Sequence, residues 1–250
     1  MEIALSLARS KTYWNDMGRL DPCWAILSRP DKRFGRWDFG EFFDTGETEI
    51  AKLMEEMSRI GLPTSRMRAL DFGCGVGRLT QPLARYFEES IGLDISDSMV
   101  ARAKELSHLP NCRFVLSDQA TLPFPAGHFD LIYTSIVLQH VPSKDLIRGY
   151  IAEFMRTLNK GGLLVMQLPS HIPLHHRLQP KRRLYQGLRE LGVSESFLFK
   201  TLKLHPILMN FLPTSDVYST VKAGGGRILF SRPDDKSSDG SESSTYYVTR

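Results

Sequence analysis

The stretch that decides the fold is Arg-Met-Arg-Ala-Leu-Asp-Phe-Gly-Cys-Gly-Val-Gly-Arg-Leu-Thr, residues 66–80. Its first half carries apolar residues at Met67, Ala69, Leu70 and Phe72, which is typical of a short buried strand. Glycine then occupies every second position, and glycine can adopt positive φ and let a ligand approach the backbone closely. The apolar spacing after the glycines predicts the start of a helix. We therefore expect free backbone N–H groups at a helix N-terminus beside the turn.

The spacing of the glycines bears on the class of ligand. Gly73, Gly75 and Gly77 read G-x-G-x-G, whereas a dinucleotide-binding turn reads G-x-G-x-x-G. Asp71 precedes the first glycine by two residues, and its carboxylate would repel a pyrophosphate but could accept hydrogen bonds from an amine. The pattern therefore disfavours an NAD-linked enzyme, although such a turn by itself is also found in ordinary strand-to-helix connections.

Two further carboxylates follow the next apolar strands. Asp94 lies in the segment 90–96 and could accept both hydroxyls of a ribose, or it could cap the helix expected over 97–106. Asp118 comes at the end of the strand expected over 112–119 and could accept the exocyclic amine of an adenine. Because parallel strands present their carboxyl ends at one edge, Asp71, Asp94 and Asp118 would share one crevice of an open α/β sheet.

Together these motifs resemble those of class I S-adenosylmethionine-dependent methyltransferases. The resemblance covers about residues 65–168 and a closing piece near the C-terminus, and it rests on residues 71–77, 94, 118–119, 129–132 and 158–165. It implies a Rossmann-like, doubly wound, seven-stranded and mostly parallel sheet with helices on both faces. It also implies S-adenosylmethionine as the cofactor and S-adenosylhomocysteine as the product.

The resemblance assigns parts of the cofactor to particular residues. Asp71 and the glycine turn would hold the methionine end. Asp94 would hold the ribose hydroxyls, and Asp118 with the backbone of Gln119 would hold the adenine. The complete set that we expect to bind the cofactor is Asp71, Gly73, Cys74, Gly75, Gly77, Asp94, Ile95, Met99, Asp118, Gln119 and Ser135.

Residues 1–64 form a predicted N-terminal helical extension, with helices over 2–17, 22–27 and 47–60. In related methyltransferases such a segment often folds over the cofactor; the candidates for this cover are Tyr13, Trp14, Arg36 and Trp37. An aromatic ring could shield a sulfonium, because a cation is attracted to a π face. Arg36 or Arg78 could pair with the methionine carboxylate. The alternative is that the tryptophans anchor the core and the arginines are solvated.

Residues 65–250 form the predicted methyltransferase domain, with an insertion at 171–212 after the fifth strand. This insertion carries seven Lys or Arg and two Asp or Glu, and Leu184, Leu188 and Leu191 form a stripe at helical spacing. We interpret it as a helical lid whose basic face contacts an acidic substrate or a charged surface. A solvated helix face is the alternative. Strands at 227–230 and 245–249 then predict a closing antiparallel hairpin.

The segment 135–142, after the fourth strand, bears on the chemistry. It lacks the Asn/Asp-Pro-Pro-aromatic sequence common in enzymes that methylate amino groups of bases or amides, and the Pro22-Cys23 pair is in the wrong place for base C5-methylation. O-, N- or C-methylation of a small molecule is therefore favoured. His140 sits where similar enzymes often place a histidine and could act as a general base, or it could hold the loop backbone. Alignment and desolvation could carry catalysis without a base.

Composition excludes several other kinds of protein. The chain has 250 residues, of which 42% are hydrophobic and 24% charged, as in ordinary globular proteins. No apolar run of about 18 residues and no signal sequence is present, so we expect no transmembrane segment and a cytoplasmic location. The three cysteines lack metal spacing, which indicates a reducing compartment. The pair His175-His176 also lacks further ligands, so we predict no metal site.

Two other functions stay open from the sequence. The basic insertion and a pI near 9.0 would suit a methyltransferase that acts on RNA or a protein, although nucleic acid is the less favoured partner. A non-catalytic protein that binds S-adenosylmethionine is the second alternative. The favoured partner is a small-molecule substrate, of an acidic kind if the lid contacts it.

Overall fold

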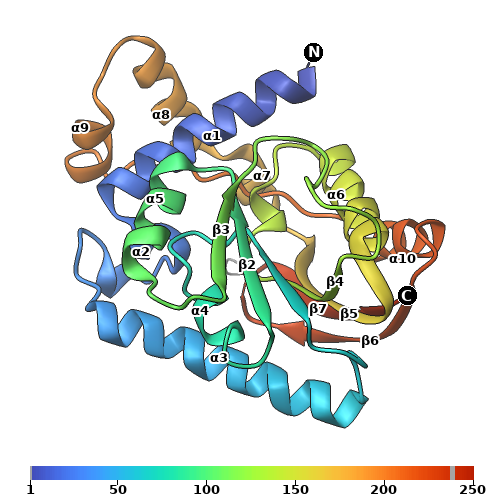
Figure 1. The fold of residues 1–250 in the computed structure, drawn as a ribbon. Helices are drawn as coiled ribbons and strands as arrows, with labels where there is room; N and C mark the ends of the chain where they lie inside the picture. The colour runs from blue at the N-terminus through green and yellow to red at the C-terminus, as the bar shows by residue number, and fades with distance from the viewer. Residues whose placement is uncertain (1, 237–239) are drawn as a thin grey trace.

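The computed structural model describes residues 2–236 and 240–250. Its centre is a seven-stranded sheet of order β3-β2-β1-β4-β5-β7-β6 (Figure 1). The strands are β1 (Arg68–Phe72), β2 (Glu89–Asp94), β3 (Cys112–Leu116), β4 (Phe129–Thr134), β5 (Leu158–His171), β6 (Arg227–Asp234) and β7 (Glu242–Thr249). Strands β1 to β5 pair in parallel, and β7 is antiparallel to both β5 and β6. The predicted Rossmann-like sheet with its closing hairpin is therefore confirmed.

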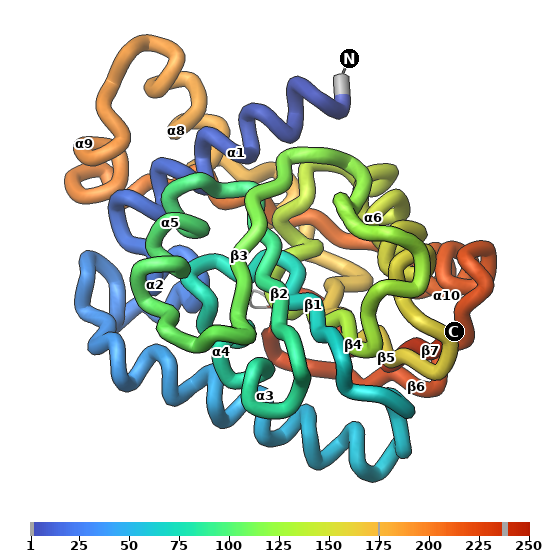
Figure 2. The backbone as a smooth tube through the Cα atoms, viewed as in Figure 1, coloured from blue at the N-terminus to red at the C-terminus, as the bar shows by residue number. Residues whose placement is uncertain are grey.

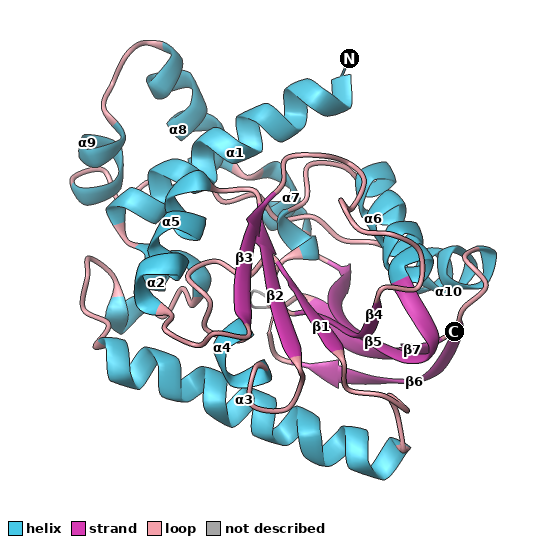
Figure 3. Cartoon of the chain, in the orientation of Figure 1, coloured by secondary structure: helices cyan, strands magenta, loops and turns pink. Residues whose placement is uncertain are grey.

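Helices cover both faces of this sheet (Figure 3). Leu70, Ile132 and Leu164 pack on the face that carries α6 (Lys144–Thr157) and α10 (Thr214–Ala223). Their neighbours Ala69 and Leu131 pack on the other face, against α3 (Phe39–Ile60). Because successive side chains of a strand alternate between faces, the central strands are apolar on both sides.

Several helix starts follow the capping rules read from the sequence. Ser96 and Ser143 precede α5 (Asp97–Leu106) and α6, and each side chain accepts a hydrogen bond from a backbone N–H three residues on. Helix α3 begins at Phe39, eight residues before the predicted start. Asp38 caps it by accepting from Glu41 N at 3.0 Å, and two glycines in the first turns concealed the helix from its pattern.

The helix after the glycine turn is much shorter than the sequence suggested. This helix, α4, spans only Thr80–Leu83. One turn of helix adds little dipole to a binding site, because the macrodipole is a sum over aligned peptide units. A helix therefore starts after the glycine turn as expected, but it is short, and the expectation that its N-terminus faces a ligand stays a prediction.

The N-terminal segment contributes to two parts of the fold. Helix α1 (Glu2–Leu20) crosses the molecule beside the carboxyl end of β3 and is followed by α2 (Pro22–Ile26) and a 3₁₀ turn (Pro30–Lys32) (Figures 1 and 2). Helix α3, in contrast, packs on the central sheet through Ile50, Leu53 and Met57. The division of the chain at residue 64 stays a prediction.

The insertion folds as α7 (Leu174–Leu178), α8 (Pro180–Glu190) and α9 (Glu195–Lys200). Tyr185, Leu198 and Leu204 form a small core there, against which Tyr13 of α1 packs. Of the predicted leucine stripe, Leu188 packs against this core beside Tyr185, whereas Leu184 is 54% and Leu191 81% exposed. Within the described residues, every helix is too short or too polar to cross a membrane.

Candidate active site

A cavity of about 950 Å³, partly open to solvent, lies at the carboxyl ends of the central strands. Its floor comes from strand ends and from the glycine turn, at Phe72, Gly73, Gly75, Asp94 and Ser135. Helix α1 closes it with the side chains of Leu7, Ser10 and Trp14. A cavity of this size and mixed lining is typical of a small-molecule site.

The glycine turn is fastened to β2 by its own amides. Gly73 N and Cys74 N donate to Leu93 O at 2.7 and 3.1 Å, and Gly75 N donates to Asp94 Oδ2 at 2.8 Å. These N–H groups, which we expected to be free for a ligand, therefore hold the fold together. Gly73 has a φ of 79°, and a Cβ there would lie 2.4 Å from the Val137 side chain. Glycine is required by both conformation and space.

Asp94 stands on the cavity wall, as predicted. Its Oδ2 accepts from Gly75 N, and its Oδ1 accepts from Ser96 N at 2.9 Å. Burial raises the pKa of Asp94, although these two backbone donors oppose the shift. Each carboxylate oxygen has a second lone pair available for a donor in the cavity. The position is therefore compatible with the predicted ribose contact.

Asp71 lies beneath the turn and outside the cavity wall. It is 2% exposed, and its Oδ2 accepts from Thr80 Oγ1 at 2.6 Å. Burial raises its pKa to about 7, although the hydroxyl of Thr80 opposes the shift. The alternation along β1 sends Asp71 to the face covered by α3 and α4, which is why it meets Thr80 where we expected an amine of the ligand.

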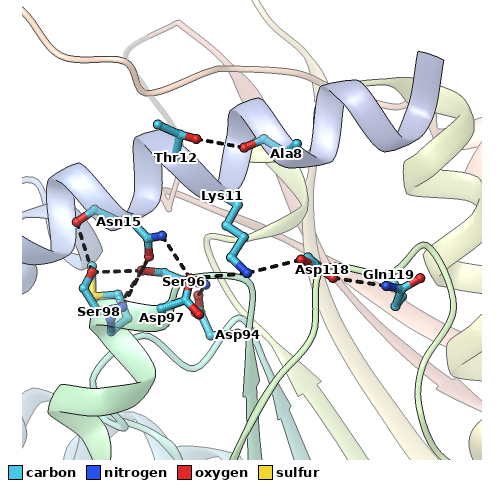
Figure 4. Close-up of polar contacts among 11 residues, drawn as sticks. Ala8, Lys11, Thr12, Asn15, Asp94, Ser96, Asp97, Ser98, Asp118 and Gln119 are labelled. Carbon is cyan, nitrogen blue, oxygen red and sulfur yellow. Dashed lines mark hydrogen bonds and ion pairs between the residues drawn. The ribbon is translucent and has the colours of Figure 1, made fainter. Parts of the chain in front are cut away.

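Asp118 also lies outside the cavity wall. Its carboxylate is 42% exposed and pairs with Lys11 Nζ of α1 at 3.2 Å, and Lys11 also lies 3.3 Å from Asp97 (Figure 4). The neighbours Ser117 and Gln119 line the cavity instead. The Asp118 side chain therefore lies beside the cavity, and its contact with an adenine stays a prediction.

Polar contacts hold α1 over the cavity. The side-chain oxygen of Asn15 accepts from Ser96 Oγ at 2.8 Å and from Ser98 N at 3.2 Å, and Asn15 Nδ2 donates to Asp97 Oδ2 at 3.1 Å (Figure 4). These contacts join the middle of α1 to the first turn of α5. The helix that closes the cavity is therefore anchored at the ribose end.

Two of the four predicted cover residues reach a cavity. Trp14 lines the cofactor cavity and also a second, adjoining cavity, whereas Tyr13 lines only the second. Trp37 is 6% exposed and packs edge-on against Phe42 in the core. Arg36 is exposed and lies on neither wall. The alternative weighed for Trp37 and Arg36, a core anchor and a solvated cation, is what the structure shows.

The second cavity encloses about 1160 Å³, including space open to solvent, between α1 and the insertion. It shares Ser10, Trp14, His140 and Pro142 with the first cavity. Two cations line it, Arg9 from α1 and Arg182 from α8. The Nε of Arg182 is buried and has no hydrogen-bond partner among the described residues, and burial lowers the pKa of Arg182. An anionic group would complete this cavity.

His140 lies at the junction of the two cavities, in a 3₁₀ turn (Leu138–His140). Its Nδ1 lies 2.5 Å from Leu208 O, so Nδ1 carries the proton and donates. Its Nε2 is then an acceptor and lies 3.4 Å from Gln139 Nε2. Burial lowers the pKa of His140 to about 4, so the ring is neutral near neutral pH. The Trp14 ring packs 5.5 Å from it, centroid to centroid.

The structure divides the predicted cofactor set in two. The members on the cavity wall are Gly73, Gly75, Asp94, Ile95, Met99, Gln119 and Ser135. The members behind or beside it are Asp71, Cys74, Gly77 and Asp118. Cys74 is buried, and burial raises the pKa of its thiol, which suits the packing role read from the sequence.

Sequence reasoning missed wall residues that lack a local signal. Leu7, Ala25 and Ile26 reach the cavity only because distant segments pack over it. Capping and helix periodicity describe neighbours along the chain, so they carry no information on such contacts.

The described residues contain no group of three His, Cys, Asp or Glu side chains placed to hold a metal ion. One member of the pair considered above, His175, has a side chain outside the described part. The expectation of no metal site therefore stays a prediction.

Comparisons with known proteins fit this geometry. Residues 70–166 match the family model of a methyltransferase domain. A trans-aconitate 2-methyltransferase of Variovorax paradoxus is 36% identical over 136 residues, which are 54% of this chain and 48% of that protein. A 2-methyl-6-phytyl-1,4-hydroquinone methyltransferase of Synechocystis is 26% identical over 64% of this chain and 50% of its own length. The chain thus spans about half the length of these curated relatives.

Among solved structures, a magnesium protoporphyrin IX methyltransferase from Synechocystis PCC 6803, with bound S-adenosylmethionine, superimposes with a TM-score of 0.61. The match covers 98% of this chain and 97% of that one at 18% identity, so it speaks to the fold. The family model thus identifies residues 70–166 as a methyltransferase domain.

Proposed function

We propose that this chain transfers a methyl group from S-adenosylmethionine to a small anionic molecule. The observation that carries the proposal is the pair of adjoining cavities that meet at Trp14 and His140. One cavity has the chemistry of a nucleoside site, and the other is lined by two arginines. A donor and an acceptor held in such neighbouring sites need little further organisation to react.

The residues that line the first cavity would hold the cofactor in one orientation, with its nucleoside end at β2 and β3 and its methionine end at β1 and β4. Asp94, at the end of β2, would offer lone pairs to the ribose hydroxyls, and Gln119, after β3, would lie beside the adenine. Arg78 and Ser135 lie on the β1–β4 side and would face the methionine end. The Nε of Arg78 is buried without a partner among the described residues, which suits an incoming carboxylate.

The second cavity selects the acceptor. Arg9 and Arg182 would pair with a carboxylate or another anionic group, because a guanidinium offers several N–H donors in a fixed plane. The trans-aconitate methyltransferases among the relatives are named for a carboxylate substrate, which agrees with an acidic acceptor here. The methyltransferase domain would then supply the cofactor half of the site, and the helical insertion would supply the acceptor half.

The cofactor supplies an electrophilic methyl group on a sulfonium sulfur. The part played by this chain is to align the acceptor, exclude water with Trp14 and Val137, and leave His140 Nε2 as a neutral acceptor at the junction. A carboxylate acceptor is ionised near neutral pH and needs no base. A hydroxyl acceptor would need one, and His140 is the side chain placed for it.

The test is a screen of small carboxylates and uncharged alcohols as methyl acceptors, followed by kinetics of two variants. Arg182→Met should raise the KM of an anionic acceptor about 10- to 100-fold, because a hydrogen bond to a charged group contributes about 1.5–3 kcal/mol. Arg183→Met is the matched control, since Arg183 is exposed on α8 outside the cavity wall, and it should change the KM less than about twofold. Acceptors limited to uncharged molecules would contradict the proposal, and steeply salt-dependent methylation of RNA would favour the alternative function.

A further inference from the structure

A buried polar cluster lies at the β1–β4 side of the cofactor cavity. Arg78 Nη2 donates to Glu49 Oε2 at 2.9 Å, and Lys236 Nζ donates to Glu49 Oε1 at 2.6 Å and to Ser135 Oγ at 2.9 Å. Tyr133 Oη donates to Glu49 Oε1 at 2.7 Å. Two members, Arg78 and Ser135, stand on the cavity wall. The cluster therefore connects α3, β4 and the segment after β6 to the floor of the cavity.

Among residues 2–236 and 240–250, which the structure describes, the charges of this cluster do not balance. Arg78 and Lys236 are two cations. Burial alone would raise the pKa of Glu49, but the charges of Arg78 and Lys236 outweigh it and lower that pKa to about 2, so Glu49 is one full anion. Tyr133 stays neutral, because burial raises the pKa of its hydroxyl. Asp71, with a pKa of about 7, is only partly ionised near neutral pH and is bonded to Thr80.

A buried excess of positive charge is costly unless an anion completes it. The side chain of Arg78 is 4% exposed, so water does not solvate it freely, and its Nε lacks a partner among the described residues. Lys236 donates to Ser135 Oγ, a hydroxyl of the cavity wall, which brings its charge to the edge of the cavity. The missing anion would therefore sit in the cavity beside Ser135 and Arg78.

We infer that Lys236, together with Arg78, forms the site for the carboxylate of the cofactor's methionine end, with Glu49 neutralising only one of the two positive charges. The inference rests on the proposed function, which puts S-adenosylmethionine in this cavity. It adds a positioning residue from the far end of the chain: Lys236 follows β6, and its backbone N is held by Asp234 Oδ1 at 3.1 Å. The segment that follows the edge strand β6 would thus help to bind a ligand whose nucleoside end lies at β2 and β3.

The experiment compares two ligands that differ only in the carboxylate, S-adenosylmethionine and decarboxylated S-adenosylmethionine, by titration calorimetry. The wild-type protein should prefer the first. Lys236→Met should reduce this preference about tenfold or more, because it removes a hydrogen-bonding cation from the subsite. The affinity for the decarboxylated ligand should stay within about twofold of wild type.

Two further variants make the result specific. Lys52→Met removes an exposed cation on α3, three residues from Glu49, and should leave the preference unchanged. Glu49→Gln removes the balancing anion, so the preference for the carboxylate should rise; this opposite sign is not expected from general damage to the fold. Equal weakening of both ligands in Lys236→Met, or a lower preference in Glu49→Gln, would overturn the inference. If wild-type protein binds neither ligand, the proposed function fails instead.

Discussion

The contact between Asp94 and the ribose gives the sharpest test of the cofactor site. In the wild type the two carboxylate oxygens of Asp94 accept hydrogen bonds from Gly75 N at 2.8 Å and from Ser96 N at 2.9 Å. Asp94→Asn keeps the shape of the side chain but leaves only one oxygen to accept them. One backbone N–H then faces an amide NH₂, which costs about 1–3 kcal/mol. Burial raises the pKa of Asp94, which shows that the buried charge is unfavourable. Removing this charge therefore offsets part of the cost. We expect the folded protein to lose less than about 2 kcal/mol of stability.

The loss in binding should be larger than the loss in stability. Two hydroxyl bonds to a charged acceptor become bonds to a neutral one, and the difference is about 1–1.5 kcal/mol for each. The sum, about 2–3 kcal/mol, predicts an S-adenosylhomocysteine Kd that is raised about 30- to 150-fold. Titration calorimetry at pH 7.5 measures it, and a thermal melt shows whether the variant is folded.

A control and an analogue separate this effect from general damage. Asp44→Asn changes an exposed acid on α3 that lines neither cavity, and we expect less than a threefold change in Kd. An analogue that lacks both ribose hydroxyls should bind the wild type and Asp94→Asn with nearly equal affinity. A folded Asp94→Asn protein with unchanged affinity for S-adenosylhomocysteine would refute the assignment of Asp94 to the ribose.

The remaining predictions concern two buried groups. Asp71 has a folded-state pKa of about 7, above its ordinary value, so its ionisation lowers stability progressively from about pH 4 to about pH 7. Asp71→Asn should therefore be more stable than wild type at pH 8, by about 4 kcal/mol, and should differ little at pH 4; denaturant titrations at both pH values measure this, and equal differences at both would contradict it. His140 has a pKa of about 4, so kcat should not show an inflection from it between pH 6 and 9, and His140→Asn should keep kcat within about tenfold. An apparent pKa near 6.5 that disappears in the His140→Asn variant would show that His140 is a base in the reacting complex.

Periodicity, helix caps and glycine spacing are properties of residues that are neighbours in the sequence. They were sufficient to predict the type and order of most helices and strands. Ser96 and Ser143 cap helices as their sequence context indicates, and the strand-turn pattern at residues 66–80 predicts β1 and its turn. The grouping of acids at strand ends followed from parallel pairing. The sequence alone therefore determined the sheet, its closing hairpin and the edge at which the site lies.

Tertiary structure decided which side chains face the cavity, because that depends on strand register and on packing between distant segments. Alternation along β1 directs the Asp71 side chain to Thr80. Asp118 pairs with Lys11 of α1, so Ser117 and Gln119 line the cavity in its place. Lys236 meets Glu49 across 187 positions of the chain. No local pattern encodes such a contact, because the free energy that holds it comes from burial and charge pairing that exist only once the sheet has formed.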